Sequence, residues 1–403
     1  MRYRILFLGA VAAVCGPSAF AQTAPDPPST ATMKFGPLAL KSTVTFNNVG
    51  LDTNVFNQAD ADHPQSDFTA TLTPTTDVWL HVGPTRLIGT VKQAFGYYKR
   101  FSSERSMNNN YKLEWLVPLN RLTMKAGVGY LRTKDRPGFE IDARSRRKET
   151  DLDGAVEIRA SGKTHISVKA LRYGVNFDAA AMFLGTDLHN ELNRTTTTRA
   201  LGVRYQLTPL TSLAADVSRD QDRFEFSPLR DADSTRIAGT VTFDPFALIK
   251  GSATLGYRNF KPLSADLPGY KGATAIVDLS YSVFETTKLS VQALRDVQYS
   301  FDINQPYYLQ TGVTASFQRQ LFGPFDAIAR IGVQQLDYRD RLGALLPVSN
   351  RIDHVHTYGG GIGYRLGRDA RIGFNVDRQS RTSGIDARQY DGLRVGTSVT
   401  YGL

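Results

Sequence analysis

The sequence predicts an all-β protein, a single transmembrane antiparallel β-barrel of about 18 strands, with 16 strands as the smaller alternative. Short stretches that alternate apolar and polar residues recur from about residue 37 onward. Tight turns and longer polar loops join these stretches in alternation, which is typical of outer-membrane barrels. The turns recur every 36 to 47 residues, roughly two strands with one turn and one loop. They are placed at Gly83-Pro84, Leu119-Asn120, 161–163, Thr208-Pro209, Asp244-Pro245, Glu285-Thr286, Gly323-Pro324 and Gly367-Arg368.

The N-terminus predicts export. Residues 1–21 combine the basic Arg2 and Arg4, an apolar run over 5–14, and a small-x-small cleavage site that ends at Ala21. The apolar run is too short to cross a bilayer as a helix. We therefore expect a signal peptide that is cleaved near Ala21.

Residues 22–36 are rich in proline, serine, threonine and alanine. This composition favours a flexible periplasmic lead-in. Residues 37–403 are expected to form one barrel domain, because a barrel closes on itself and needs no internal linker. The expected location is the outer membrane of a Gram-negative bacterium.

The strands are predicted from the period of two that places alternate residues on opposite faces. In 121–133, for example, Leu122, Met124 and Val128 share one face while Lys125 and Gly127 share the other. The predicted strands are 38–49, 67–82, 86–101, 110–118, 121–133, 151–160, 164–177, 195–207, 212–225, 234–243, 250–261, 272–283, 287–301, 307–321, 326–339, 352–366, 370–381 and 390–403. Pro74 is expected to mark a bulge, because proline cannot donate to a ladder.

The last strand suggests a partner in assembly. Its residues Leu393, Val395, Val399, Tyr401 and Leu403 share one face. This alternation at the terminus resembles the C-terminal signal that the barrel-assembly machinery recognises, although that signal usually ends in Phe. We expect this machinery to bind the C-terminal strand.

The sequence argues against an enzyme and against a metal or cofactor site. Cys15 is the single cysteine and lies in the signal peptide. Zinc-protease, nucleophile-elbow and phosphate-loop motifs are missing. His165 and Ser167 share a strand face, as catalytic residues of outer-membrane lipases can, but nothing marks an oxyanion hole. His354 and His356 also share a face, where they could hold a metal or simply lie at the barrel rim.

The charge balance points to anionic partners. The formal net charge is +10, or +8 without Arg2 and Arg4. An exported chain does not meet nucleic acid, so outer-membrane lipid, lipopolysaccharide and anionic polysaccharide are the expected partners. Four bases in the loop 134–150 could contact lipopolysaccharide phosphates or simply be solvated; they are Arg144, Arg146, Arg147 and Lys148.

The phase of each strand predicts which charged residues face the interior. Ten bases are expected to line a pore: Lys125, Arg159, Lys169, Arg204, Arg236, Arg258, Arg330, Arg365, Arg371 and Arg394. Four acids are expected there: Glu157, Asp216, Asp278 and Asp377. This excess would attract anions. In the alternative interpretation, the charges pair across the wall and stiffen the barrel.

A short segment after the first strand carries a family resemblance. The run Val49-Gly50-Leu51-Asp52-Thr53-Asn54-Val55-Phe56 resembles the corresponding segment of the putative β-barrel porin family. Asp52 and Asn54 can fold the loop through Asx turns, while Val55 and Phe56 are expected to pack at the rim.

The resemblance implies an outer-membrane protein of a kind often linked with exopolysaccharide biosynthesis and export. A porin-like channel is the expected function, with anionic saccharides as candidate solutes, because 18 strands enclose an aqueous channel. The alternatives are an occluded structural or docking barrel of a polysaccharide-secretion assembly and an outer-membrane hydrolase.

Overall fold

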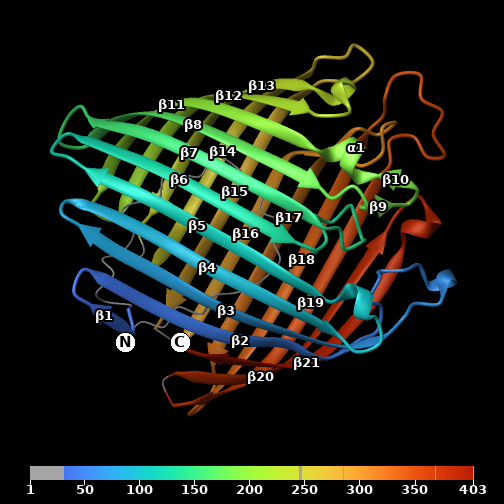
Figure 1. Ribbon diagram of the computed structural model, residues 1–403, viewed down its shortest axis with the longest axis horizontal. Helices are drawn as coiled ribbons and strands as arrows, with labels where there is room; N and C mark the ends of the chain where they lie inside the picture. Colours follow the sequence, from blue (N-terminus) through green and yellow to red (C-terminus); the bar gives the residue numbers. More distant parts are fainter. Residues whose placement is uncertain (1–30, 245–246, 285, 368, 403) are drawn as a thin grey trace.

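The protein forms a closed barrel of 18 antiparallel strands (Figure 1). A computed structural model describes residues 31–244, 247–284, 286–367 and 369–402. The expected signal peptide, most of the expected lead-in and Leu403 lie outside the described residues. Each of the 18 strands pairs with its neighbours in chain order, so the predicted count and topology are confirmed.

The barrel strands are 12 to 16 residues long, enough to cross a bilayer when tilted. Those of the first half are β2 (Leu38–Asp52), β3 (Asp67–Val82), β4 (Thr85–Tyr98), β5 (Ser106–Pro118), β6 (Leu122–Thr133), β7 (Arg147–Arg159), β8 (Thr164–Phe177), β11 (Arg194–Thr208) and β12 (Thr211–Phe224). Those of the second half are β13 (Ala232–Phe243), β14 (Ile249–Pro262), β15 (Tyr270–Val283), β16 (Thr287–Tyr299), β17 (Tyr307–Gln320), β18 (Phe325–Arg339), β19 (Ile352–Leu366), β20 (Ala370–Thr382) and β21 (Tyr390–Tyr401).

The first and last barrel strands close the ring. β2 pairs with β21 from Val44↔Tyr401 to Asp52↔Arg394, with a register shift between Phe46 and Val49. Asn48 has a positive φ of 52° at this shift, so the irregularity is a bulge in β2. Closure leaves no strand edge exposed to lipid.

The two ends of the barrel differ, as the turn pattern predicts. Tight turns connect the strands at one end, which we call the short-turn end, and loops of seven to sixteen residues connect them at the other, the long-loop end (Figure 1). The long loops carry the small elements β9 (Met182–Phe183), β10 (Thr186–Asp187), α1 (Leu188–Leu192), η2 (Asp60–Asp62), η3 (Ser102–Glu104), η4 (Pro228–Arg230) and η5 (Asp386–Arg388). None of the helices in the described part of the chain has the length and apolar character needed to cross a membrane.

Each strand presents an apolar face outward and a polar face inward. On β11, Leu201 and Val203 are 63% and 47% exposed, whereas Gly202 between them is buried. The inward faces are identified by ion pairs that skip a strand, such as Arg204 on β11 with Glu157 on β7. Side chains can meet across an intervening strand only on the concave side of the wall.

Two details differ from the sequence-based expectation. Pro74 lies in β3 without a register shift on either side, so the predicted bulge there is wrong. Pro74 instead lies where the β3–β4 ladder is interrupted, between Leu72↔Phe95 and Thr75↔Lys92. On the other side, β3 stays in register with β2 through Val44↔Pro74. The end of the lead-in is ordered as β1 (Met33–Phe35), which pairs with the start of β2.

Val128 tests the outward assignment, because it is 49% exposed near the middle of β6. We expect Val128→Arg to lower the free energy of unfolding in a lipid bilayer by about 2–4 kcal/mol, since an arginine near the midplane meets hydrocarbon. Gln292→Arg on the inward face of β16 is the control, because Gln292 is exposed there. Equal losses in reversible unfolding would show that the faces are wrongly assigned.

Candidate functional site

The interior wall carries a ladder of ion pairs. The structure places the ten predicted bases on inward faces, and nine of them lie within ion-pair distance of a carboxylate. These pairs are Lys125–Glu114, Lys169–Asp216, Arg204–Glu157, Arg236–Asp296, Arg258–Asp296, Arg330–Asp377, Arg365–Asp326, Arg371–Asp326 and Arg394–Asp52. The tenth, Arg159, donates to the carbonyl oxygen of Asn120 at 2.7 Å.

The sequence-based count of four inward acids is too low. Glu114, Asp296, Asp326 and Asp52 also face the interior and hold predicted bases. Their strand phase identifies them as inward residues, so the signal was present in the sequence. The wall of the described barrel is therefore close to charge balance along this ladder, as the alternative interpretation expects.

The most buried part of the ladder centres on Asp296 of β16. Its two carboxylate oxygens accept hydrogen bonds from Arg236 at 2.6 Å and Arg258 at 2.9 Å. Asp296 is 3% exposed, and both arginines are less than a tenth exposed. Removing one partner of such a buried pair typically costs about 3–5 kcal/mol. The two pairs connect β16 with β13 and β14, so they stabilise the stretch of wall from β13 to β16.

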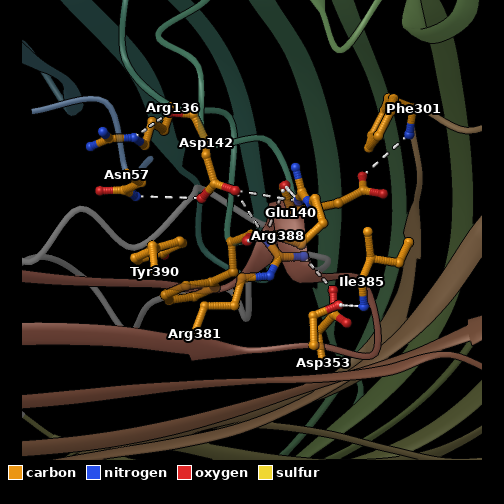
Figure 2. Close-up of polar contacts among 12 residues, drawn as sticks. Asn57, Arg136, Glu140, Asp142, Phe301, Asp353, Arg381, Ile385, Arg388 and Tyr390 are labelled. Atoms are coloured by element: carbon orange, nitrogen blue, oxygen red, sulfur yellow. Dashed lines mark hydrogen bonds and ion pairs between the residues drawn. The ribbon is translucent and has the colours of Figure 1, made fainter. Parts of the chain in front are cut away.

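The long-loop end is crossed by the loop 134–146 between β6 and β7, which we call the mouth loop. Glu140 in this loop is buried beneath residues from the opposite side of the ring (Figure 2). Its carboxylate accepts hydrogen bonds from Ser300 Oγ at 2.6 Å and from the backbone N–H of Phe301 at 3.2 Å, both in the β16–β17 loop. The mouth loop thus reaches across the barrel entrance.

Two arginines from the β20–β21 side hold the same loop. Arg381 donates to the carbonyl oxygens of Phe139 and Glu140 at 3.0 and 3.2 Å and to Asp142 at 3.1 Å. Arg388 donates to the carbonyl oxygen of Glu140 and lies 3.4 Å from Asp142 (Figure 2). These contacts join residues about 240 positions apart, and local sequence patterns carry no signal for them.

Apolar side chains fill the space beside the mouth loop. Ile141 packs in a buried cluster with residues of β8 and of the β8–β11 loop. The other buried members are Val175, Phe177, Ala181, Phe183, Leu188, Leu192 and Phe301. The entrance at the long-loop end is consequently narrowed by a packed core, not by isolated polar side chains.

The motif after β2 anchors the mouth loop. Val55 is fully buried, and its carbonyl oxygen accepts hydrogen bonds from Arg136 at 2.8 Å and Arg144 at 2.9 Å. Phe56 packs edge-to-face on Phe101 with ring centroids 4.8 Å apart. Both residues therefore lie at the rim, and the backbone of Val55 carries the contact with the mouth loop.

The same motif fastens the closing seam between β2 and β21. Asp52 accepts the backbone N–H of Asn54 in an Asx turn and pairs with Arg394 at 2.8 Å. Asn54 donates to the carbonyl oxygen of Gln58 at 2.8 Å and to that of Asp391 on β21 at 3.0 Å. Asp52 and Asn54 are both almost fully buried.

Arg136 of the mouth loop is bound by backbone carbonyl oxygens at the entrance. Its guanidinium donates to the backbone carbonyl oxygens of Asp142 and Val55, and no ion pair with a carboxylate is found for it among the described residues. Burial, reinforced by the nearby Arg144, lowers the pKa of Arg136 to about 10. The group therefore stays protonated at neutral pH.

The wall below the entrance is more open. Gln292 and Asp278 lie side by side on the inward faces of β16 and β15, and both are exposed in mid-strand. Inward residues near the long-loop end, such as Asp296 and Arg258, are buried instead. The inward wall is thus more accessible in mid-strand at β15 and β16 than near the long-loop end.

The other candidate residues are placed as follows. Ser167 Oγ donates to the carbonyl oxygen of Gly202 at 3.5 Å, and Nδ1 of His165 lacks a hydrogen-bond partner. His354 and His356 lie on the outward face of β19 with ring centroids 6.4 Å apart. Of the four loop bases, Arg144 pairs with Glu104 and donates to the carbonyl oxygen of Val55, so the solvated alternative does not hold for it.

Arg147 is a second loop base that departs from that expectation. It is buried at the start of β7, where it pairs with Glu149 at 2.6 Å and donates to the carbonyl oxygen of Asp135 at 2.8 Å. Arg146 and Lys148 are exposed.

A substitution at Asn54 tests how much this motif stabilises the seam between β2 and β21. We expect Asn54→Ala to lower the free energy of unfolding by about 1–3 kcal/mol, because the backbone groups of Gln58 and Asp391 lose buried partners. Urea titration of the purified barrel measures this loss. Asn176→Ala, at an exposed position on the outer face of β8, is the matched control. An unfolding midpoint for Asn54→Ala equal to that of the control would contradict the role of Asn54 in fastening the seam.

Glu140 predicts a pH dependence. Burial raises the pKa of Glu140 above its ordinary value of 4.5, against the opposing effects of Ser300, Arg388, Arg351 and Arg381. The folded state then binds more protons than the unfolded state between the two pKa values, so stability falls as pH rises through that window.

We expect the stability of the wild type, relative to Glu140→Gln, to decline from pH 4.5 upward. Urea unfolding of both proteins between pH 4 and 8 measures the difference in their free energies of unfolding. The other titrating groups are common to both proteins, so their contributions largely cancel in this difference. A difference that grows with pH would overturn the assignment.

Comparison with known proteins identifies the family. Residues 26–402 match the model of the family described as Putative beta-barrel porin 2. No curated protein matches significantly. Similar solved structures include a BenF-like porin from Pseudomonas fluorescens Pf-5, at 10% identity and a TM-score of 0.48, covering 92% of this chain and 99% of that one. OccK2 (OpdF) of Pseudomonas aeruginosa in complex with glucuronate is another, at 11% identity and a TM-score of 0.45, with coverage of 90% and 97%. Because the family model spans nearly the whole chain, this protein belongs to the putative beta-barrel porin 2 family.

Proposed function

We propose that the protein is a passive outer-membrane channel for small hydrophilic solutes, with acidic saccharides as the solute class. Family membership supports an outer-membrane porin-type barrel. The observation that carries the proposal is the contrast within the interior. Exposed inward residues such as Gln292 line the lower wall, while the mouth loop and its packed neighbours narrow the entrance.

In this proposal the mouth loop limits conductance. A solute that enters from the long-loop side, which is extracellular in such barrels, meets the cation of Arg136 before it reaches the charge-balanced wall. Because the wall bases already have carboxylate partners, anion preference is assigned to the entrance and not to the ladder. A role in exopolysaccharide export would follow if acidic oligosaccharides pass.

A second candidate function is an occluded structural barrel that docks a polysaccharide-secretion assembly. The fully buried Glu140 and the apolar cluster around Ile141 favour it, because both fill the entrance with packed groups. Conductance separates the two functions, since an occluded barrel passes no ions.

Deletion of residues 138–142 tests the channel. We expect the wild type to give small, stable steps in planar bilayers and the deletion to enlarge them severalfold, because it removes the groups that Arg381 and Arg388 hold. Removal of 342–346 in the exposed β18–β19 loop is the matched control and should leave the step size unchanged.

Reversal potentials across a salt gradient measure selectivity in the same membranes. We expect a mild anion preference that weakens in Arg136→Gln and at high salt, because screening shortens the reach of charge to about 8 Å at physiological ionic strength. Silent membranes for both the wild type and the 138–142 deletion, with folded barrel present, would reject the channel in favour of the occluded barrel.

A further inference from the structure

On the outer wall, a row of apolar residues is followed directly by a row of polar and basic residues. Across β11 to β14, the outward residues Leu201, Val217, Ile237 and Tyr257 pair in one row, and all four are at least half exposed. The next outward row toward the long-loop end consists of polar and basic residues. They are Arg199, Arg219, Thr235, Asn259 and Lys271.

A second polar row follows, and four of the five bases in the two rows have no ion pair within the described chain. It contains Arg172, Thr197, Gln221, Asp233 and Lys261. Asp233 pairs with Arg219 at 3.0 Å and, one row higher, with Arg223 at 2.7 Å. Within the described chain, no ion pair is found for Arg172, Arg199, Lys261 or Lys271, and all four are exposed.

These rows border a groove on the outer surface. It is about 460 Å³ in volume, and its lining includes Arg172, Asn176, Thr195, Thr197, Gln221 and Arg223. Glu225 adds one carboxylate to the lining. Guanidinium, hydroxyl and amide donors that converge directly above an exposed apolar belt suit a phosphate group on a lipid.

The other side of the barrel lacks this arrangement. On the outward faces of β18, β20 and β21, Arg339 pairs with Asp337 at 2.7 Å and Arg378 pairs with Asp391 at 2.5 Å. Those arginines are satisfied within the protein. The bases over β8 and β11–β15 differ from these two arginines, because most of them have no such partner within the described chain.

We propose that the groove over β8, β11 and β12 is a binding site for a phosphorylated glycolipid of the outer leaflet. Its acyl chains lie on the apolar belt, and its phosphates contact Arg172 in the groove and Arg199 in the polar row directly below it. The chemistry is that of the lipid A portion of lipopolysaccharide, which carries phosphates on a disaccharide above several acyl chains. This site lies outside the barrel and does not depend on whether the interior conducts.

Native mass spectrometry of the folded barrel in detergent tests the site, with diphosphoryl lipid A as the probe. We expect lipid adducts on the wild type and at least about tenfold weaker binding for the double variant Arg172→Gln/Arg199→Gln, because two charge-assisted contacts are lost. Arg172→Lys/Arg199→Lys keeps the charge and should retain much of the binding.

Lys163→Gln/Arg319→Gln is the matched control. It removes two exposed bases at the short-turn end, far from the groove, and should bind like the wild type. A lipid with the same acyl chains but without phosphates should bind weakly to all four proteins.

Three outcomes would overturn the proposal. They are equal binding by the Gln double variant and the control, equal binding of phosphorylated and dephosphorylated lipid, and displacement of lipid A by millimolar inorganic phosphate. The last outcome would assign the groove to free phosphate. Heat-modifiable migration of every variant verifies that each barrel is folded before binding is compared.

Discussion

Closure of the ring is the constraint on which the rest of this structure depends. A strand edge in hydrocarbon would leave a row of unpaired backbone N–H and C=O groups, each costing several kcal/mol. The closing pair is also irregular, because the β2–β21 ladder is interrupted by the bulge at Asn48. Asp52 and Asn54 reinforce it with contacts to Arg394 and Asp391 on the last strand. The motif that resembles the family segment thus lies at the irregular pairing that closes the wall.

Closure also creates the two electrostatic environments of the barrel. Inward charges face one another across a concave surface, so a base such as Arg330 finds a carboxylate on the next strand but one. Outward charges diverge on the convex surface and meet a partner only on neighbouring strands, as Arg378 meets Asp391. The same residue types therefore brace the wall from inside and remain available to external ligands from outside.

The sequence predicted the wall well because a strand in a membrane obeys a local rule. Period-two alternation fixes the face of Leu122 or Lys125 within a few residues, and tight turns mark the ends of the strands. The mouth was not predictable in this way. Glu140 meets Ser300, and Arg381 meets Asp142, through contacts that depend on how distant loops fold over the entrance.

Pro74 shows a second limit of local rules. Proline cannot donate in a ladder, but the register of β3 continues through it, and the bulge lies at Asn48 on the neighbouring strand. The ladder tolerates one missing donor where its other partners hold the register. The partners of the inward charges were similarly not predictable. Alternation in the sequence predicts which face a residue lies on, but not which two residues meet across an intervening strand.

The mouth loop is held in part through its main chain. Arg381 and Arg388 bind carbonyl oxygens of the loop, while its own Arg136 binds the carbonyl oxygen of Val55. A carbonyl oxygen is present whatever side chain a residue carries. Substitutions at solvent-facing loop positions can therefore accumulate during divergence while the anchorage persists, and an engineer could re-line the entrance by the same route without redesigning the barrel.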